Sequence, residues 1–172
     1  MASLIEEFID VLEKEHDEYV TLLKLSKEKT PIIVKNDIGK LQKLTEEEQI
    51  VVENITHLEK KRVEVLNDIA AVINKDVNTL KIPTLLEILA KQPKEHGRLN
   101  EVHKKLKTVL SDMKMTNERN RVLIEQSLEL IQFDVNLLQS MKQAPETGNY
   151  NRNAYNAGMA LGAGSGGFDA KQ

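Results

Sequence analysis

The chain has no cysteine, no tryptophan and few aromatic residues. The absence of cysteine excludes disulfide bonds, thiol catalysis and thiolate metal sites. Aromatic residues make up only 3% of the 172 residues and charged residues 30%, a balance that favours extended amphipathic helices over a compact α/β enzyme or a β-sandwich. Because the formal net charge is only −3, there is no bulk attraction to nucleic acid or to an anionic membrane.

Long hydrophobic runs are also missing. No stretch approaches the roughly 18 apolar residues of a membrane span, and acids stand near the N-terminus where a signal peptide needs basic residues. We therefore expect a cytoplasmic protein without membrane insertion. No glycine-rich loop lies between a strand and a helix to hold a phosphate, and no serine has a placed histidine and acid. We expect no enzyme, no cofactor and no nucleic-acid binding.

What the sequence has instead is helical periodicity. Apolar residues recur every three or four positions, the spacing of a helix with one buried face, and the first such series runs from Ile5 to Ile33. Pro31 lies inside this series. It should kink or end the helix near Thr30, unless residues 32–35 restart it.

A second apolar series runs from Ile38 to Ile73, and Asn36 or Asp37 precedes it as a candidate N-cap. Because only one or two residues separate the two helices, they must fold back as an antiparallel hairpin. After this hairpin, Thr84-Leu-Leu-Glu87 has the pattern of a capping box that opens a short connecting helix.

A third long series runs from Leu99 to Met141, with Glu101 and Lys105 spaced to pair on its outer face. The predicted fold class is all-α, with three long antiparallel amphipathic helices in a coiled-coil-like bundle, a short connecting helix and a flexible C-terminal tail. We assign residues 1–141 to the helical bundle and residues 142–172 to the tail. The tail contains six of the eight glycines and no apolar periodicity.

The helix lengths predict that the third helix outruns its neighbours. It should draw level with the hairpin turn at about Ile131, which leaves about ten residues, or roughly 15 Å, beyond that point. The apolar residues of this overhang are Ile131, Phe133, Val135, Leu137, Leu138 and Met141. An exposed apolar patch of this kind usually marks an interaction site, which a second copy, the chain's own tail or a foreign helix could cover.

Polar residues at two places raise the question of a special role. Asn117 and Asn120 interrupt the third apolar stripe. We interpret them first as a buried polar layer that fixes register, with direct contact to a partner as the alternative. Glu13 and His16 have the E-x-x-H spacing of helical di-iron proteins, but the chain has no second such pair, so we expect no metal site.

Several segments resemble the FlgN-type export chaperones of the bacterial flagellum, and together they cover nearly the whole chain. They are Leu4–Glu15, Leu25–Thr30, Ile33–Asp37, Asn117–Ile131 with its two asparagines, and a tail with tyrosines and glycines that closes on Phe168-Asp-Ala-Lys-Gln172. Pro31 departs from the pattern expected of the family's first helix.

The resemblance implies a chaperone for hook-associated proteins (FlgK- or FlgL-like clients), which masks their apolar C-terminal helices until export. Such chaperones bind the client helix by helix-in-groove recognition with the end of their last long helix. Here that segment carries Ile124, Leu128, Ile131, Val135 and Leu138. The resemblance also implies docking on the cytoplasmic domain of the export gate through a tyrosine after that helix. Tyr150 matches it best by position, and Tyr155 is the alternative.

Two other classes compete with this interpretation. A non-flagellar coiled-coil scaffold or adaptor would bury its apolar surface in a stable homodimer, and a helical metalloprotein is a more distant alternative. A homodimer is also possible for the chaperone. For the tail we predict that it folds back across residues 131–141 for part of the time and competes with the client.

Overall fold

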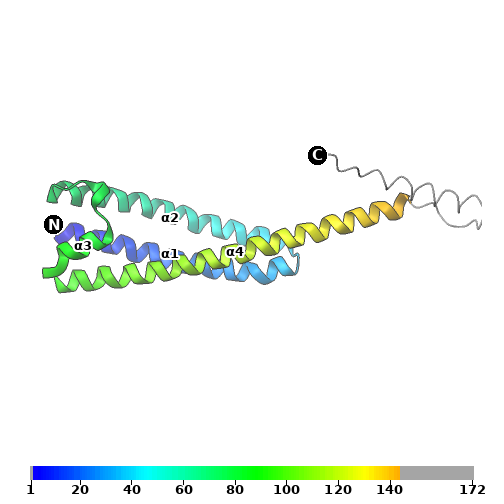
Figure 1. Cartoon of the computed structure of the whole chain (residues 1–172), viewed down its shortest axis with the longest axis horizontal. Coiled ribbons are helices and arrows are strands. Elements are labelled where there is room, and N and C mark those ends of the chain that lie inside the picture. Colours follow the sequence, from blue (N-terminus) through cyan, green and yellow to red (C-terminus); the bar gives the residue numbers. More distant parts are fainter. Residues whose placement is uncertain (1, 144–172) are drawn as a thin grey trace, which may run out of the picture. The chain divides into compact units, whose positions relative to one another are not determined.

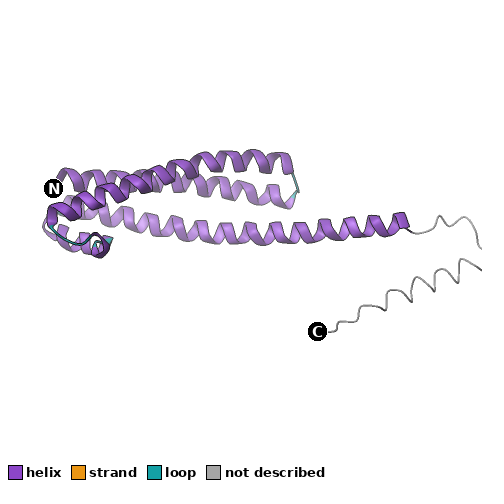
Figure 2. Ribbon diagram, turned by 90° about the horizontal axis from the view of Figure 1, so that it is seen from above, coloured by secondary structure: helices purple, strands orange, loops and turns teal. Residues whose placement is uncertain are grey.

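The computed structural model describes residues 2–143, and in this part every regular element is a helix (Figures 1 and 2). The four α-helices are α1 (Ala2–Val34), α2 (Ile38–Ile73), α3 (Ile82–Ile88) and α4 (Pro93–Gln143), and short 3-10 turns span Val77–Thr79 and Leu89–Lys91. The predicted all-α fold class is therefore confirmed. The chain divides into two compact units, Met1–Leu130 and Ile131–Gln172, and each is described by itself.

The turn between α1 and α2 forms differently from the prediction at Pro31. The helix continues through Pro31 to Val34, so of the predicted alternatives an end near Thr30 is wrong. Asn36 follows the helix in the left-handed conformation (φ 53°), and its N–H bonds to the carbonyl of Ile33 at 3.0 Å. This C-terminal motif, together with the burial of Ile33 (3% exposed), holds the last turn although the proline lacks one backbone donor.

Both ends of α2 have side-chain or backbone caps. The carboxylate of Asp37 accepts a hydrogen bond from the backbone N–H of Lys40 at 3.2 Å, which confirms Asp37 as the N-cap. At the other end, Asn74 adopts the left-handed conformation (φ 51°), and the N–H of Lys75 bonds to the carbonyl of Ala70 at 3.0 Å. An asparagine with positive φ thus stands at each end of α2, Asn36 in the turn before it and Asn74 directly after it.

The short connecting helix begins earlier than predicted. It starts at Ile82, with Pro83 in its first turn and no side-chain cap. Proline is preorganised for this position because its missing N–H would have no partner there. The hydroxyl of Thr84 donates to the carbonyl of Thr79 at 3.4 Å, so the predicted capping box at Thr84 is wrong. Pro93 is likewise a proline at the start of a helix, since α4 begins with it.

The hydrophobic core of the first unit joins residues from α1, α2, the connecting segment and α4. Its most deeply buried members are Ile5, Ile9 and Leu12 of α1, Val65 and Ile69 of α2, Leu85 and Leu89 of the connection, and Leu99 of α4. The predicted stripes of α1 and α2, and that of α4 as far as Met113, are therefore largely core. Ile38 is an exception at 72% exposed, because it opens α2 beside the turn.

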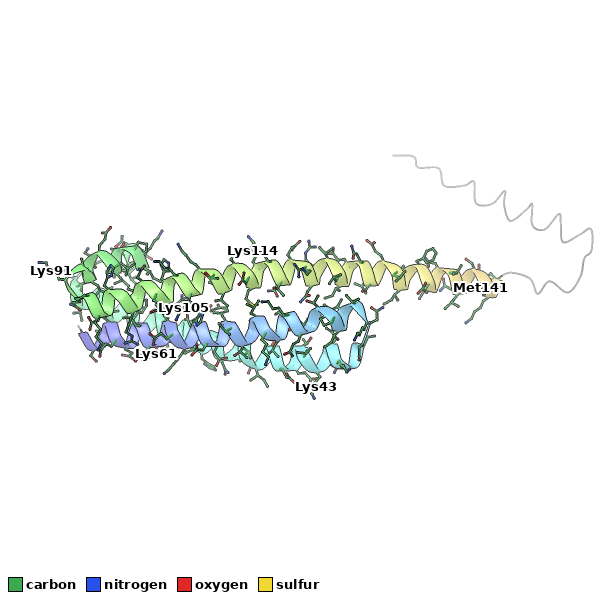
Figure 3. The ribbon with its side chains drawn as sticks, turned by 90° about the horizontal axis from the view of Figure 1, so that it is seen from below. Lys43, Lys61, Lys91, Lys105, Lys114 and Met141 are labelled. Atoms are coloured by element: carbon green, nitrogen blue, oxygen red, sulfur yellow. The ribbon has the colours of Figure 1, made fainter. Side chains whose placement is uncertain are left out.

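Charged side chains cover the outer faces of the helices (Figure 3). The predicted pair on α4 is present, with Lys105 Nζ 2.8 Å from the Glu101 carboxylate. Lys61 of α2 pairs with Glu7 of α1, also at 2.8 Å. Pairs as exposed as these contribute little to stability, so the fold depends on the apolar core.

One acid is buried inside the hairpin. Glu15 is 2% exposed, and among the described residues its Oε1 has no hydrogen-bond partner. Arg62 Nε lies 3.4 Å from that oxygen. Burial raises the pKa of Glu15, the charge of Arg62 opposes this rise, and the nearby Glu59 adds to it. Desolvation of the carboxylate is thus the larger effect.

The buried acid gives a pH-dependent prediction. Because the pKa of Glu15 is higher in the folded chain than in the unfolded one, its ionisation opposes folding increasingly as the pH rises through the folded pKa. Glu15→Gln should therefore melt at a higher temperature than the parent protein at pH 7, and the difference should shrink toward about pH 4. Melting curves from pH 4 to 8 test this, with the exposed Glu53→Gln as control. A lower melting temperature for Glu15→Gln at pH 7 would mean that the pair with Arg62 outweighs desolvation.

Candidate functional site

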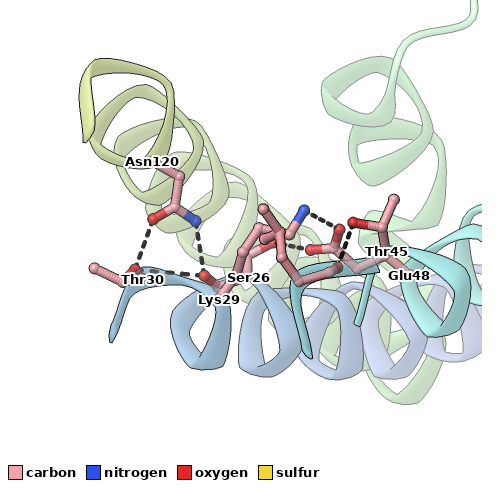
Figure 4. A network of polar contacts seen from close by, with 7 residues as sticks. Ser26, Lys29, Thr30, Thr45, Glu48 and Asn120 are labelled. Carbon is pink, nitrogen blue, oxygen red and sulfur yellow. Dashed lines mark hydrogen bonds and ion pairs between the residues drawn. The ribbon is translucent and has the colours of Figure 1, made fainter. Parts of the chain in front are cut away.

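A polar layer joins three helices of the first unit at the end of their common packing (Figure 4). Asn120 of α4 is 5% exposed. Its amide nitrogen donates to the carbonyl of Ser26 at 2.8 Å, and its amide oxygen accepts from the hydroxyl of Thr30 at 2.7 Å. The Ser26 hydroxyl donates to Glu48 of α2 at 3.1 Å, and the same carboxylate pairs with Lys29. The layer therefore joins α4 to α1 and α1 to α2.

The two asparagines of the α4 stripe have different environments. The buried-layer interpretation is confirmed for Asn120 and is wrong for Asn117, which is exposed. The buried positions of α4 continue from Met113 to Asn120 through the half-buried Thr116, so Asn117 falls one residue outside them. It lines an open groove together with Ile124. Contact of Asn117 with a partner stays a prediction.

Beyond Asn120, α4 has no buried residue in the described part of the chain. In the first unit Ile124 is 37% exposed and Leu128 is 60% exposed. The exposed part of the predicted apolar stripe thus begins at Ile124, earlier than the length argument placed it. The reason is that Asn120 already lies level with Thr30, about one turn before α1 ends.

In the second unit the described residues, 131–143, are all exposed. Three of the predicted client-binding residues lie here, namely Ile131 (44% exposed), Val135 (41%) and Leu138 (58%). Phe133, Leu137 and Met141 are also at least half exposed, and Met141 is labelled near the end of α4 in Figure 3. We call Ile124, Leu128, Ile131, Val135 and Leu138 the distal stripe. Five large apolar side chains exposed at helical spacing are typical of a binding surface.

Comparison with known protein families identifies the family of the chain. The family model described as FlgN protein matches residues 1–158 of the chain. The chain belongs to the FlgN family. No curated protein and no solved structure matches it. Family membership implies the role of a flagellar export chaperone that binds hook-associated proteins.

The family match extends over the distal stripe and over both tyrosines singled out in the sequence. Tyr150 and Tyr155 lie outside the described residues, as does the tail that was predicted to fold back across residues 131–141. The docking role of the two tyrosines and the folding back of the tail therefore stay predictions. Among the helices of residues 2–143, none has the length and apolar character needed to cross a bilayer.

The E-x-x-H pair of this FlgN-family chain is part of an ion-pair cluster. Glu13 accepts two hydrogen bonds from the guanidinium of Arg98 on α4, at 3.2 and 2.8 Å, and Asp10 accepts another at 2.9 Å. His16 lies 3.5 Å from Asp17. Within residues 2–143 there is no group of three or more histidines and acids that could hold a metal ion. Glu13 therefore helps to join α1 to α4.

The polar layer predicts different effects for the two asparagines. Asn120→Ala should leave the Ser26 carbonyl and the Thr30 hydroxyl without their α4 partner and destabilise the fold by about 1–3 kcal/mol. The matched control, Asn117→Ala, changes an exposed side chain and should alter stability by less than about 0.5 kcal/mol. Urea unfolding of both variants measures the difference. Equal stabilities would show that the Asn120 hydrogen bonds contribute nothing.

Proposed function

We propose that this chain binds the C-terminal helix of hook-associated proteins, of the FlgK or FlgL kind, on the distal stripe of α4. Binding there would mask the apolar face of the client in the cytoplasm until export. The observation that carries the proposal is the exposure of all five stripe residues, between 37% and 60%, on a helix whose preceding apolar residues form the core.

The spacing of the distal stripe supports this mode of binding. Its members follow one another by four, three, four and three residues from Ile124 to Leu138, the spacing of an apolar strip along one face of a helix. An amphipathic client helix would cover the strip with its own apolar residues at i, i+3, i+4 and i+7. Each large side chain removed from water contributes about 1.5–3 kcal/mol when fully buried, so a few such contacts are enough to hold a transient complex.

Delivery of the client would use a separate part of the chain. We propose that Tyr150, or alternatively Tyr155, docks on the cytoplasmic domain of the export gate. Both follow α4 in the sequence, within the range that the family model matches. Tyrosine suits such a contact because it combines a large apolar ring with a polar hydroxyl.

A homodimeric coiled-coil scaffold is the second candidate function. It rests on the same exposed stripe, because a second copy could bury it as well as a client helix could. The two functions differ in what they require of the free protein. A scaffold is a stable dimer that does not bind hook-associated proteins, whereas a chaperone keeps the stripe available and binds them.

The proposed client site gives a prediction that separates binding from folding. Leu138 is 58% exposed, so Leu138→Ala should barely change the melting temperature and should weaken client binding about tenfold or more, as expected for an interface side chain worth over 1 kcal/mol. Leu99 is fully buried, and the control Leu99→Ala should cost about 2–5 kcal/mol of stability. Melting curves and pull-down with purified hook-associated proteins test both. A Leu138→Ala variant that is strongly destabilised but binds the client normally when folded would refute the assignment of Leu138 to the client site.

The export-gate contact gives a complementary prediction. Tyr150→Ala should abolish binding to the purified cytoplasmic domain of the gate and leave the client affinity unchanged, because the two contacts lie on different segments. If Tyr155 is the docking residue, Tyr155→Ala should have this effect instead. Surface plasmon resonance with immobilised gate domain measures the loss. Full gate binding by the double variant would exclude both tyrosines.

A further inference from the structure

In the first unit, Ile124 and Leu128 of the distal stripe lie to one side of the α4 residues that pack toward the hairpin. In the first unit the buried positions alternate by three and four residues, at Leu99, Val102, Leu106, Val109, Met113 and Asn120. Leu123 and Ser127 continue this alternation and are half-buried. Ile124 and Leu128 each come one residue later and are exposed. These two stripe residues are therefore open to a partner although they follow the buried Asn120 by only one and two helical turns.

These positions bear on how a partner can bind. At about 100° per residue, Ile124 and Leu128 lie about 40° and 80° to one side of Asn120, and Leu123 and Ser127 lie about 60° and 20° to its other side. A helix that covers the stripe can lie beside α4 without taking the place of α1. The two hydrogen bonds of Asn120 to α1 do not need to break.

The charges around the distal stripe point to the chemistry of the partner. Between Ile124 and Met141, α4 carries Glu125, Glu129 and Asp134 and no lysine or arginine. Arg121, just before this stretch, already pairs with Glu118 and with Glu125, each at 2.6 Å. Electrostatic complementarity therefore favours a partner with positive charges beside its apolar face.

We propose that the client helix adds to α4 as an extra helix with lysine or arginine residues flanking its apolar stripe, while the hairpin and the polar layer stay intact. This inference rests on the proposed function, because it concerns the same surface. It specifies which side of α4 the client covers, that the hydrogen bonds of the polar layer remain, and that the client carries positive charges beside its apolar face.

Because the chain has no cysteine of its own, single introduced cysteines can report which side of α4 the client covers. Single variants Ile124→Cys and Leu128→Cys test the stripe, and Leu123→Cys and Ser127→Cys are matched controls on the other side of Asn120. Thiol labelling rates are compared without and with a saturating concentration of each purified hook-associated protein. We expect client binding to slow labelling about tenfold or more at the two stripe positions, because the client covers them. A tenfold change corresponds to about 1.4 kcal/mol. At the two controls labelling should slow less than about twofold. Stronger protection of the controls would place the client on the other side and overturn the proposal.

A cross-link between α1 and α4 tests whether these two helices must separate when the client binds. Thr30 and Asn120 touch through their side chains at 2.7 Å, so Thr30→Cys with Asn120→Cys can be joined by oxidation or by a short bismaleimide. The cross-linked protein should bind the client within about twofold of its uncross-linked form. Loss of binding only after cross-linking would show that the client displaces α1. If the unmodified protein binds no hook-associated protein at all, the proposed function fails. This outcome differs both from binding that survives the cross-link and from binding that is lost only after it.

Charge reversal tests the flanking residues of the partner. Glu129→Lys and Asp134→Lys should each slow association with the client about threefold or more at low salt, and added salt should slow association of the parent protein. Glu53→Lys, a reversal on α2 outside the stripe, is the control and should have a smaller effect. Unchanged or faster association of both stripe variants would contradict a basic partner.

Discussion

The contact of Asn120 with Ser26 and Thr30 determines how α4 is divided. Before it, α4 supplies a row of buried apolar residues to a core shared with the hairpin. After it, no described residue of the helix is buried. A buried amide can be satisfied only in one register, because its donor and acceptor must both meet partners. The same hydrogen bonds thus fix the alignment of α4 and mark the place where its apolar residues become available to other molecules.

Exposed apolar surface is ordinarily a liability, since it promotes unspecific association. In an export chaperone the same surface has a purpose, because the client's own helix must be covered before assembly. The first unit provides the stability for this arrangement. Its core draws on all parts of the bundle, including Leu85 and Leu89 from the short connection, so the stripe need not contribute to folding. Under the proposed function, folding and client binding therefore use different residues of a single helix.

Local rules of spacing and capping were enough to predict the long helices, the hairpin and an N-cap at Asn36 or Asp37, of which the structure has Asp37. The prediction failed where local rules compete with tertiary packing. Pro31 should have ended α1, but the buried Ile33 and the positive φ of Asn36 hold one more turn. Asn117 and Asn120 look alike in the sequence. Only the angle of α4 against α1, which no local pattern contains, buries one and exposes the other.

The connecting segment shows the same limit. A short apolar run gives too few turns for its periodicity to show which residues enter the core, so Leu80, Leu85 and Leu89 were not assigned to it. Likewise the length argument identified an exposed end of α4 but placed its start at Ile131, because it assumed that the helices rise in step. Polar contacts such as that of Asn120 set the true alignment, and they involve residues about 90 positions apart in the chain.

Hydrogen exchange of the free protein and of its complex with a hook-associated protein tests the account most directly. In the free protein the amides of α4 before Asn120 should exchange slowly, with those from Ile124 to Gln143 exchanging much faster, because stable packing ends at the polar layer. Client binding should slow exchange from Ile124 to Leu138 and leave α1 and α2 unchanged. Equally slow exchange along all of α4 in the free protein, or client protection confined to α1 and α2, would contradict the account.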